Sequence, residues 1–96
     1  MKLVRLLQPA EREMVDAACY YQSQSSGLGV EFLDKVESAF HDIAMNPDRW
    51  PVILHEIRRR LVYRFPYAVL YRIESAEVIV VAVAHLRRRP ESWTER

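Results

Sequence analysis

The sequence has little of several residue types, and each scarcity excludes a class of protein. Its 96 residues include one cysteine, Cys19, so an intrachain disulfide and a cysteine-based zinc site are excluded. We interpret Cys19 as a small buried hydrophobic residue in a reducing compartment. Two glycines and five prolines beside 50% hydrophobic residues are not the composition of a disordered chain. The apolar run 78–84 is far shorter than the roughly 18–20 residues that span a bilayer.

Lysine is missing from the second half of the chain. Residues 55–96 contain nine arginines, no lysine and five glutamates, a net charge of +4, whereas residues 1–54 contain five basic and eight acidic residues, a net charge of −3. This asymmetry indicates an acidic partner, either nucleic acid or a protein surface, and arginine favours bidentate recognition of phosphate or carboxylate. Taken alone, the charge favours a merely solvated basic surface over a binding site.

Apolar residues recur at helical spacing in two segments. This periodicity predicts one helix over residues 9–22, with Pro9 at its first position, and a second over residues 30–45, ended by Asn46-Pro47. The polar linker between them is short, so the two helices are expected to form an antiparallel hairpin.

The remaining segments have the pattern of strands. Strands are predicted over residues 3–7, 56–65, 67–74 and 78–84, the last wholly apolar and therefore central. The fold class is α+β: a single domain, residues 1–96, of order β-α-α-β-β-β, in which an antiparallel meander is covered on one face by the helical hairpin. Alternation along the second strand places Arg58, Arg60 and Arg64 together, and we expect them on the uncovered face.

Several motifs resemble one known family. "ACYYQSQSSGLGVEFLDKV", "NPDRWP", "RRRLVYRFPYAVLYRI" and "VAVAHLRRRPESW" resemble the ParE/RelE superfamily of toxins from bacterial type II toxin–antitoxin (plasmid stabilisation) modules. The likeness covers nearly the whole chain. Its most specific part is Phe65-Pro66-Tyr67 followed by Tyr71, with His85-x-Arg87 and the later Pro and Trp.

The resemblance implies a cytoplasmic toxin that a cognate antitoxin holds inactive. In this family the antitoxin often lays an amphipathic helix in an apolar groove beside the helical hairpin. The residues expected to line such a groove are Tyr20, Phe32, Val36 and Trp50. The alternative interpretation is that each of these four side chains belongs to the hydrophobic core. Exposed apolar helix surface would also allow a homodimer when the antitoxin is absent.

The superfamily contains two mechanisms. ParE-type members inhibit DNA gyrase without chemistry of their own on nucleic acid, and the FPY motif and the His-x-Arg motif are closer to this branch. The resemblance then implies a target-binding surface, which consists of Arg58, Arg60, Arg64, Arg87, Arg88, Arg89 and Trp93. We favour this interpretation.

RelE-type members are endoribonucleases that cut messenger RNA on the ribosome, so whether the chain is an enzyme depends on the branch. Here Glu56 would be the base, His85 the acid and Arg60 a cation on the phosphate. Against this, residues 68–70 are apolar where RelE relatives carry a basic residue. A third alternative is a non-toxic module that only binds antitoxin. No cofactor or metal is expected, because His41 and His55 have no partner at metal-ligand spacing.

Overall fold

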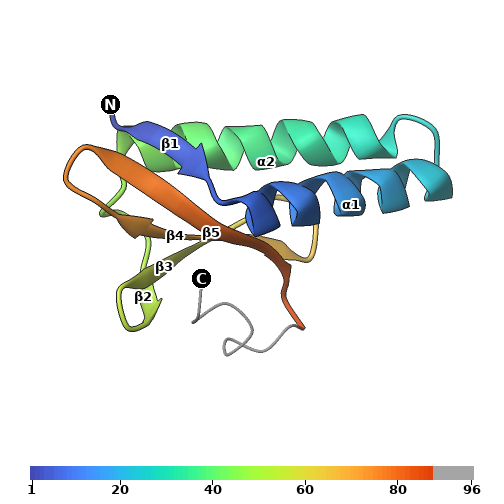
Figure 1. Cartoon of the computed structure of the whole chain (residues 1–96). Coiled ribbons are helices and arrows are strands. Elements are labelled where there is room, and N and C mark those ends of the chain that lie inside the picture. The colour runs from blue at the N-terminus through green and yellow to red at the C-terminus, as the bar shows by residue number, and fades with distance from the viewer. Residues whose placement is uncertain (88–96) are drawn as a thin grey trace.

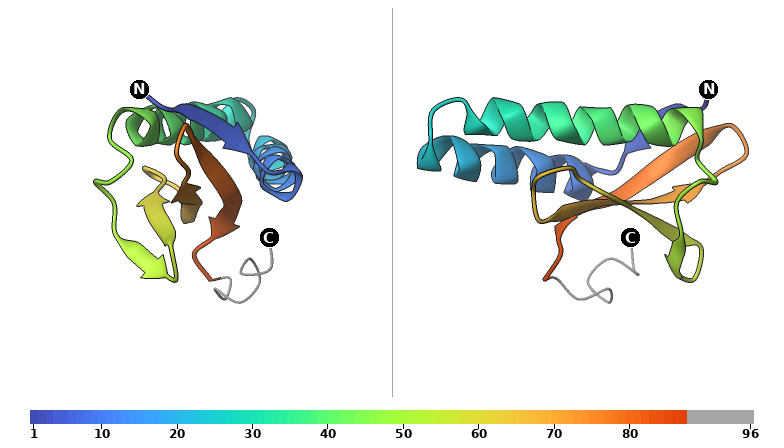
Figure 2. Two further views of the ribbon diagram at one scale, coloured as in Figure 1. Left: turned by 60° about the vertical axis from the view of Figure 1, so that its left-hand side comes forward. Right: turned by 180° about the vertical axis from the view of Figure 1, so that it is seen from behind.

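The computed structural model describes residues 1–87, which form two helices packed on one face of a five-stranded sheet (Figures 1 and 2). Helix α1 is Gln8–Gln24 and helix α2 is Leu28–Met45. The strands are β1 (Leu3–Leu6), β2 (Val52–Leu54), β3 (Ile57–Leu61), β4 (Tyr67–Ile73) and β5 (Glu77–His85). The predicted α+β class and the covering helical hairpin are confirmed.

The sheet is mixed, so the predicted pure meander is wrong in one respect. Its strand order is β1-β5-β4-β3-β2, and β1 pairs in parallel with β5 while the other neighbours are antiparallel. Two helices separate β1 from the rest of the sheet in sequence, and such a long connection allows parallel pairing. Strand β2 was not predicted, because three residues are too few to show a period, and β3 ends at Leu61 rather than continuing to residue 65.

The hairpin of α1 and α2 depends on the close approach of its two helices. Gly29 lies against α1, where an added Cβ would be 2.5 Å from the Ala18 carbonyl oxygen. Gln22 connects the two helices, because its Oε1 accepts hydrogen bonds of 3.1 Å from the backbone N–H groups of Gly27 and Gly29. Gly27 has a φ of 88°, a left-handed conformation that glycine adopts at low cost. Cys19 lies exposed on α1, so its prediction as a buried residue is wrong.

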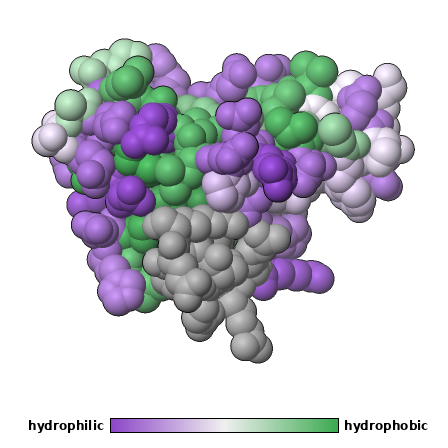
Figure 3. All heavy atoms as spheres, in the orientation of Figure 1, coloured by the Kyte–Doolittle hydropathy of each residue, from purple (hydrophilic) through white to green (hydrophobic). Residues whose placement is uncertain are grey.

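Apolar side chains form one cluster on each face of the sheet. The cluster between helices and sheet includes Phe32, Val36, Tyr71 and Val80, with an aromatic group of Tyr21, Phe65 and Tyr67 packed on Phe32. The other face carries Ile57, Ala68, Leu70, Ile79, Val81, Ala82 and Ala84, all buried. On the side of the molecule seen in Figure 3, hydrophobic side chains gather over the sheet and part of the hairpin, with polar ones around them.

The expected basic surface on the uncovered face is wrong. Arg58 and Arg60 point to the same side of the sheet as Val62, which directly follows β3 and is buried in the helix-side cluster. Their guanidinium groups contact α2 and the loop after it. This arrangement is stable because β3 lies near the sheet edge, where long side chains can bury their aliphatic stems and keep their charged ends beside acidic or carbonyl oxygens. The face opposite the helices carries the second apolar cluster instead.

Candidate interaction groove between α2 and β3

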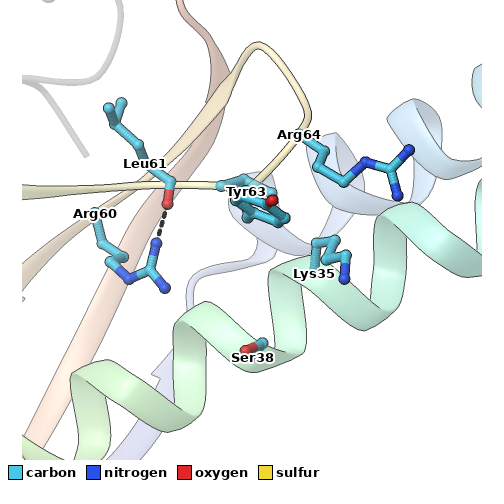
Figure 4. A pocket seen from close by; sticks show the side chains of 7 residues that line it. Lys35, Ser38, Arg60, Leu61, Tyr63 and Arg64 are labelled. Carbon is cyan, nitrogen blue, oxygen red and sulfur yellow. Dashed lines mark hydrogen bonds between the residues drawn. The ribbon is translucent and has the colours of Figure 1, made fainter.

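A groove of about 630 Å³ runs between α2 and the end of β3 (Figure 4). We call it the β3 groove; its lining residues are Lys35, Ser38, Arg60, Leu61, Val62, Tyr63 and Arg64. The groove lies where β3 ends at Leu61 and the chain turns before β4 begins at Tyr67. Arg64, with a φ of 71°, lies in that turn. Three of the seven lining residues are cationic, so the groove attracts acidic groups.

Arg60 is the most constrained cation of the β3 groove. Its Nη2 lies 2.6 Å from Asp42 Oδ2 on α2, and its Nη1 donates to the Leu61 carbonyl oxygen. The guanidinium also lies 5.3 Å from the centre of the Trp50 ring, on which Arg49 packs at 5.4 Å. Its Nε is buried without a hydrogen-bond partner among residues 1–87. With a side chain only 19% exposed, Arg60 fixes β3 to α2 while one edge borders the groove.

The other two cations of the β3 groove differ in how their charge is balanced. Arg64 forms an ion pair with Glu31, with 2.8 Å between Nη1 and Oε1. Lys35 has no ion-pair partner within the described part of the chain, and its Nζ lies 5.5 Å from the centre of the Tyr63 ring. Figure 4 shows Tyr63 lying beside Lys35, and the Tyr63 side chain is 68% exposed. Lys35 and Tyr63 therefore offer an unbalanced charge and an aromatic surface to a partner.

Arg58 has a structural role rather than a free charge. Its Nη1 donates hydrogen bonds to the carbonyl oxygens of Asp48, at 3.1 Å, and Trp50, at 2.7 Å. Beside it, the Tyr71 hydroxyl donates to the Pro47 carbonyl oxygen at 2.6 Å. Burial raises the pKa of Tyr71 to about 12, although the nearby Arg58 charge acts to lower it. Together Arg58 and Tyr71 fasten the loop between α2 and β2 to the sheet, so Arg58 is not freely available to a target.

The three candidate catalytic residues do not meet at one point. Glu56 lies in the turn between β2 and β3, and His85 ends β5 opposite Tyr67. The pairing of β3, β4 and β5 puts about six strand positions between them, roughly 20 Å along the sheet. The ring of His85 packs on Tyr67 at 5.2 Å, and its Nδ1 accepts the Arg87 backbone N–H. A base and an acid so far apart cannot act on one phosphodiester.

The structure separates the four residues predicted to bind antitoxin. Phe32 and Val36 are fully buried in the helix-side core, so their side chains are not available to a partner and that part of the prediction is wrong. The physical reason is that both lie on the stripe of α2 that packs against the sheet. Tyr20 is 58% exposed, and Trp50 is half-buried beside its two arginines. Arg87 is exposed, whereas Arg88, Arg89 and Trp93 lie outside the described residues.

Sequence reasoning missed the contribution of α2 to the β3 groove. The polar residues of α2 that face β3 recur at helical spacing, and they are Glu31, Lys35, Ser38 and Asp42. That polar stripe beside an apolar one was a usable signal, because residues three and four apart share a helix face. Among residues 1–87 no group of three histidine, cysteine or acidic side chains could hold a metal ion. None of the helices in that range is long and apolar enough to cross a membrane.

These features define a small α+β domain that presents a basic groove between α2 and β3 and that does not bring Glu56 and His85 together. Comparison with family models matches residues 4–90 to the ParE toxin of the type II toxin–antitoxin system parDE. The chain therefore belongs to the ParE toxin family, as the sequence motifs indicated.

A solved structure supports the same fold. The chain is similar to a chain of the chromosomal ParDE toxin–antitoxin system from P. aeruginosa, with a TM-score of 0.73 and 12% sequence identity. The match covers 88% of this chain and 96% of that chain. The comparison with curated proteins found no match.

Proposed function

We propose that this protein is the toxin of a type II toxin–antitoxin module, that it inhibits DNA gyrase, and that a cognate antitoxin neutralises it in the cytoplasm. The observation that carries the proposal is the match of residues 4–90 to the ParE toxin family. Gyrase inhibition by this branch requires binding and no chemistry on nucleic acid, so an interaction surface is sufficient.

The β3 groove supports a binding mode of action. Lys35 supplies a positive charge without an ion-pair partner in the described chain, and Tyr63 supplies an exposed ring beside it. Tyrosine and arginine are enriched among the residues that dominate binding energy at protein interfaces. An acidic surface of gyrase, or the DNA that gyrase holds, is attracted to such a groove. We assign target contact to Lys35, Tyr63 and Arg64, and treat Arg60 as their support.

The separation of the catalytic candidates supports inhibition without catalysis. Message cleavage needs a base at the ribose hydroxyl and an acid at the leaving oxygen, both within hydrogen-bond reach of one substrate. Glu56 and His85 lie roughly 20 Å apart by the strand register. Arg60 is engaged by Asp42 rather than directed toward His85.

The test compares two reactions run in parallel with purified protein. One measures gyrase supercoiling and cleaved DNA complexes, and the other measures message cleavage on translating ribosomes by primer extension. Inhibited supercoiling with intact message supports the proposal. Cuts in the message with active gyrase would instead place the chain with the ribonucleases, and no effect in either reaction would leave an antitoxin-binding module without toxicity.

A matched pair of variants tests the β3 groove itself. Lys35→Glu and Arg12→Glu change the net charge equally, but Arg12 lies exposed on α1 and does not line the groove. Lys35→Glu is expected to weaken gyrase inhibition by about tenfold or more, the range for a lost interface charge that becomes repulsive. Arg12→Glu is expected to inhibit normally. Equal losses in both variants would show that only net charge matters.

A further inference from the structure

A second concave site lies at the opposite edge of the sheet from the β3 groove. It is a notch of about 210 Å³ between α1 and the end of β5, lined by Glu13, Asp16, Ala17, Tyr20, Tyr67, Val83 and His85. The four α1 residues recur at i, i+3, i+4 and i+7 and therefore share one helix face. We call this site the α1–β5 notch. Figure 1 shows β5 passing beneath the first turns of α1.

The chain builds this notch where β1 stops covering β5. Strand β1 pairs with β5 only as far as Leu6 opposite Val80, after which the chain enters α1. Beyond that point Glu13 takes the place of a neighbouring strand, because its Oε1 accepts the Val83 backbone N–H at 3.2 Å. A carboxylate held against the backbone in this way is fixed in position. The neighbouring carboxylate, Asp16, is exposed and has no ion-pair partner among residues 1–87.

The lining of the notch suits a planar cation. Two carboxylates and the rings of Tyr20, Tyr67 and His85 line it, and among residues 1–87 no lysine or arginine does. His85 Nδ1 accepts the Arg87 backbone N–H at 3.1 Å, which fixes the orientation of the ring at the edge of the notch. A guanidinium group can hydrogen-bond to carboxylates through its edge and stack its face on aromatic rings at the same time. An ammonium group has no planar face with which to stack.

We propose that the α1–β5 notch receives an arginine side chain of the cognate antitoxin. The choice of the antitoxin as the partner rests on the proposed function. The charge of the notch favours that choice, because an acidic site repels DNA and DNA-bound surfaces, which the basic β3 groove on the other edge attracts. The antitoxin would then hold the edge of the sheet that the target leaves free. Tyr20, exposed and aromatic, forms the wall that the arginine stacks against.

The first experiment needs neither gyrase nor antitoxin, so failure of the proposed function does not affect it. Arginine blocked at both ends by acetyl and methylamide groups is titrated into the isotope-labelled protein, and backbone amide resonances are followed by NMR. Saturable shifts at Asp16, Tyr20 and His85 are expected, with a dissociation constant in the millimolar range that a few such contacts provide. Blocked citrulline, which has nearly the same shape without the charge, is expected to produce no saturable shift.

Variants of α1 make the assignment specific. Asp16→Asn and Tyr20→Leu are expected to weaken blocked-arginine binding by about fivefold or more, the effect of losing one charge-assisted or stacking contact. Glu11→Gln removes the same charge from the same helix outside the notch and is expected to bind normally. NMR spectra that resemble the wild-type spectrum, together with an unchanged melting temperature, would confirm that each of these surface variants folds. Equal binding of citrulline, equal loss in Glu11→Gln, or no saturable shift would overturn the notch as an arginine site.

The second experiment identifies the source of the arginine. The affinity of the antitoxin is measured by calorimetry for the wild type, Asp16→Asn and Glu11→Gln, and sedimentation velocity records whether the free toxin self-associates. A selective loss in Asp16→Asn with a monomeric free toxin supports the proposal. Unchanged antitoxin affinity, or a dimer that only Asp16→Asn dissociates, would overturn the antitoxin as the occupant and assign the notch to another partner or to a second copy.

Discussion

The Tyr71 hydroxyl donates a hydrogen bond of 2.6 Å to the carbonyl oxygen of Pro47, which joins the middle of β4 to the loop that follows α2. Tyr71 is fully buried, so this bond is formed away from water. Arg58, which pairs with Tyr71 across β3 and β4, holds the same loop through the carbonyl oxygens of Asp48 and Trp50. These bonds position Trp50, on which Arg60 packs at the border of the β3 groove.

Replacing Tyr71 by phenylalanine tests this connection. Tyr71→Phe leaves the Pro47 carbonyl oxygen without its donor, and we expect the free energy of unfolding to fall by about 1–3 kcal/mol. Urea denaturation followed by circular dichroism measures the loss. Tyr63→Phe is the control, because the Tyr63 side chain is largely exposed, and it should change the free energy of unfolding by less than about 0.5 kcal/mol. Equal stability of Tyr71→Phe and the wild type would contradict a stabilising role for the bond.

The same tyrosine gives stability a dependence on alkaline pH. Burial raises the pKa of Tyr71 to about 12, whereas an unfolded tyrosine has a pKa of about 10. The folded state therefore holds its proton while the unfolded state releases it, and stability falls as the pH rises from about 10 to 12. Burial also raises the pKa of Tyr21. This shift lowers stability at alkaline pH as well, but it does so equally in the wild type and in Tyr71→Phe. The stability difference between wild type and Tyr71→Phe should shrink across this window, and a constant difference would refute the assignment.

Arg60 is expected to affect both stability and toxicity. Arg60→Ala removes the ion pair with Asp42 and the packing on Trp50, so we expect a loss of about 1–3 kcal/mol in the free energy of unfolding and weaker growth inhibition. Arg59→Ala is the control, because Arg59 is exposed and points to the other side of β3. Thermal melts and growth arrest in cells are measured for both. A fully stable and fully toxic Arg60→Ala would show that Arg60 neither supports nor forms the contact surface.

The two glycines should respond differently to alanine. Gly29→Ala places a methyl group 2.5 Å from the Ala18 carbonyl oxygen, so the helices must separate, and we expect a loss of about 1–3 kcal/mol. Gly27→Ala meets no atom within 4 Å and costs only the strain of a positive φ, about 1 kcal/mol. Chemical denaturation of both variants gives the comparison. A larger loss in Gly27→Ala would indicate that backbone strain outweighs helix contact in this hairpin.

Local patterns in the sequence determined the elements that have a clear period. The helical stripes of α1 and α2 and the apolar run of β5 were predicted to within a few residues, because each contains enough residues to show a spacing of 3.6 or an unbroken burial pattern. The FPY and His-x-Arg motifs indicated the ParE toxin family. The match of residues 4–90 to that family confirmed the prediction. The three-residue strand β2 carried no such signal, and its pairing depends on β3.

Tertiary structure alone decided which face of the sheet the arginines occupy and which residues meet. Alternation along β3 placed Arg58 and Arg60 on one side, but only the packing of α2, with Asp42 within 2.6 Å of Arg60, showed that this side faces the helices. Likewise, the strand register separated Glu56 from His85, and the end of β1 at Leu6 brought Glu13 to Val83. Such relationships join residues far apart in sequence. They are set by the balance of packing, charge and hydrogen bonding in the folded chain, which no local spacing records.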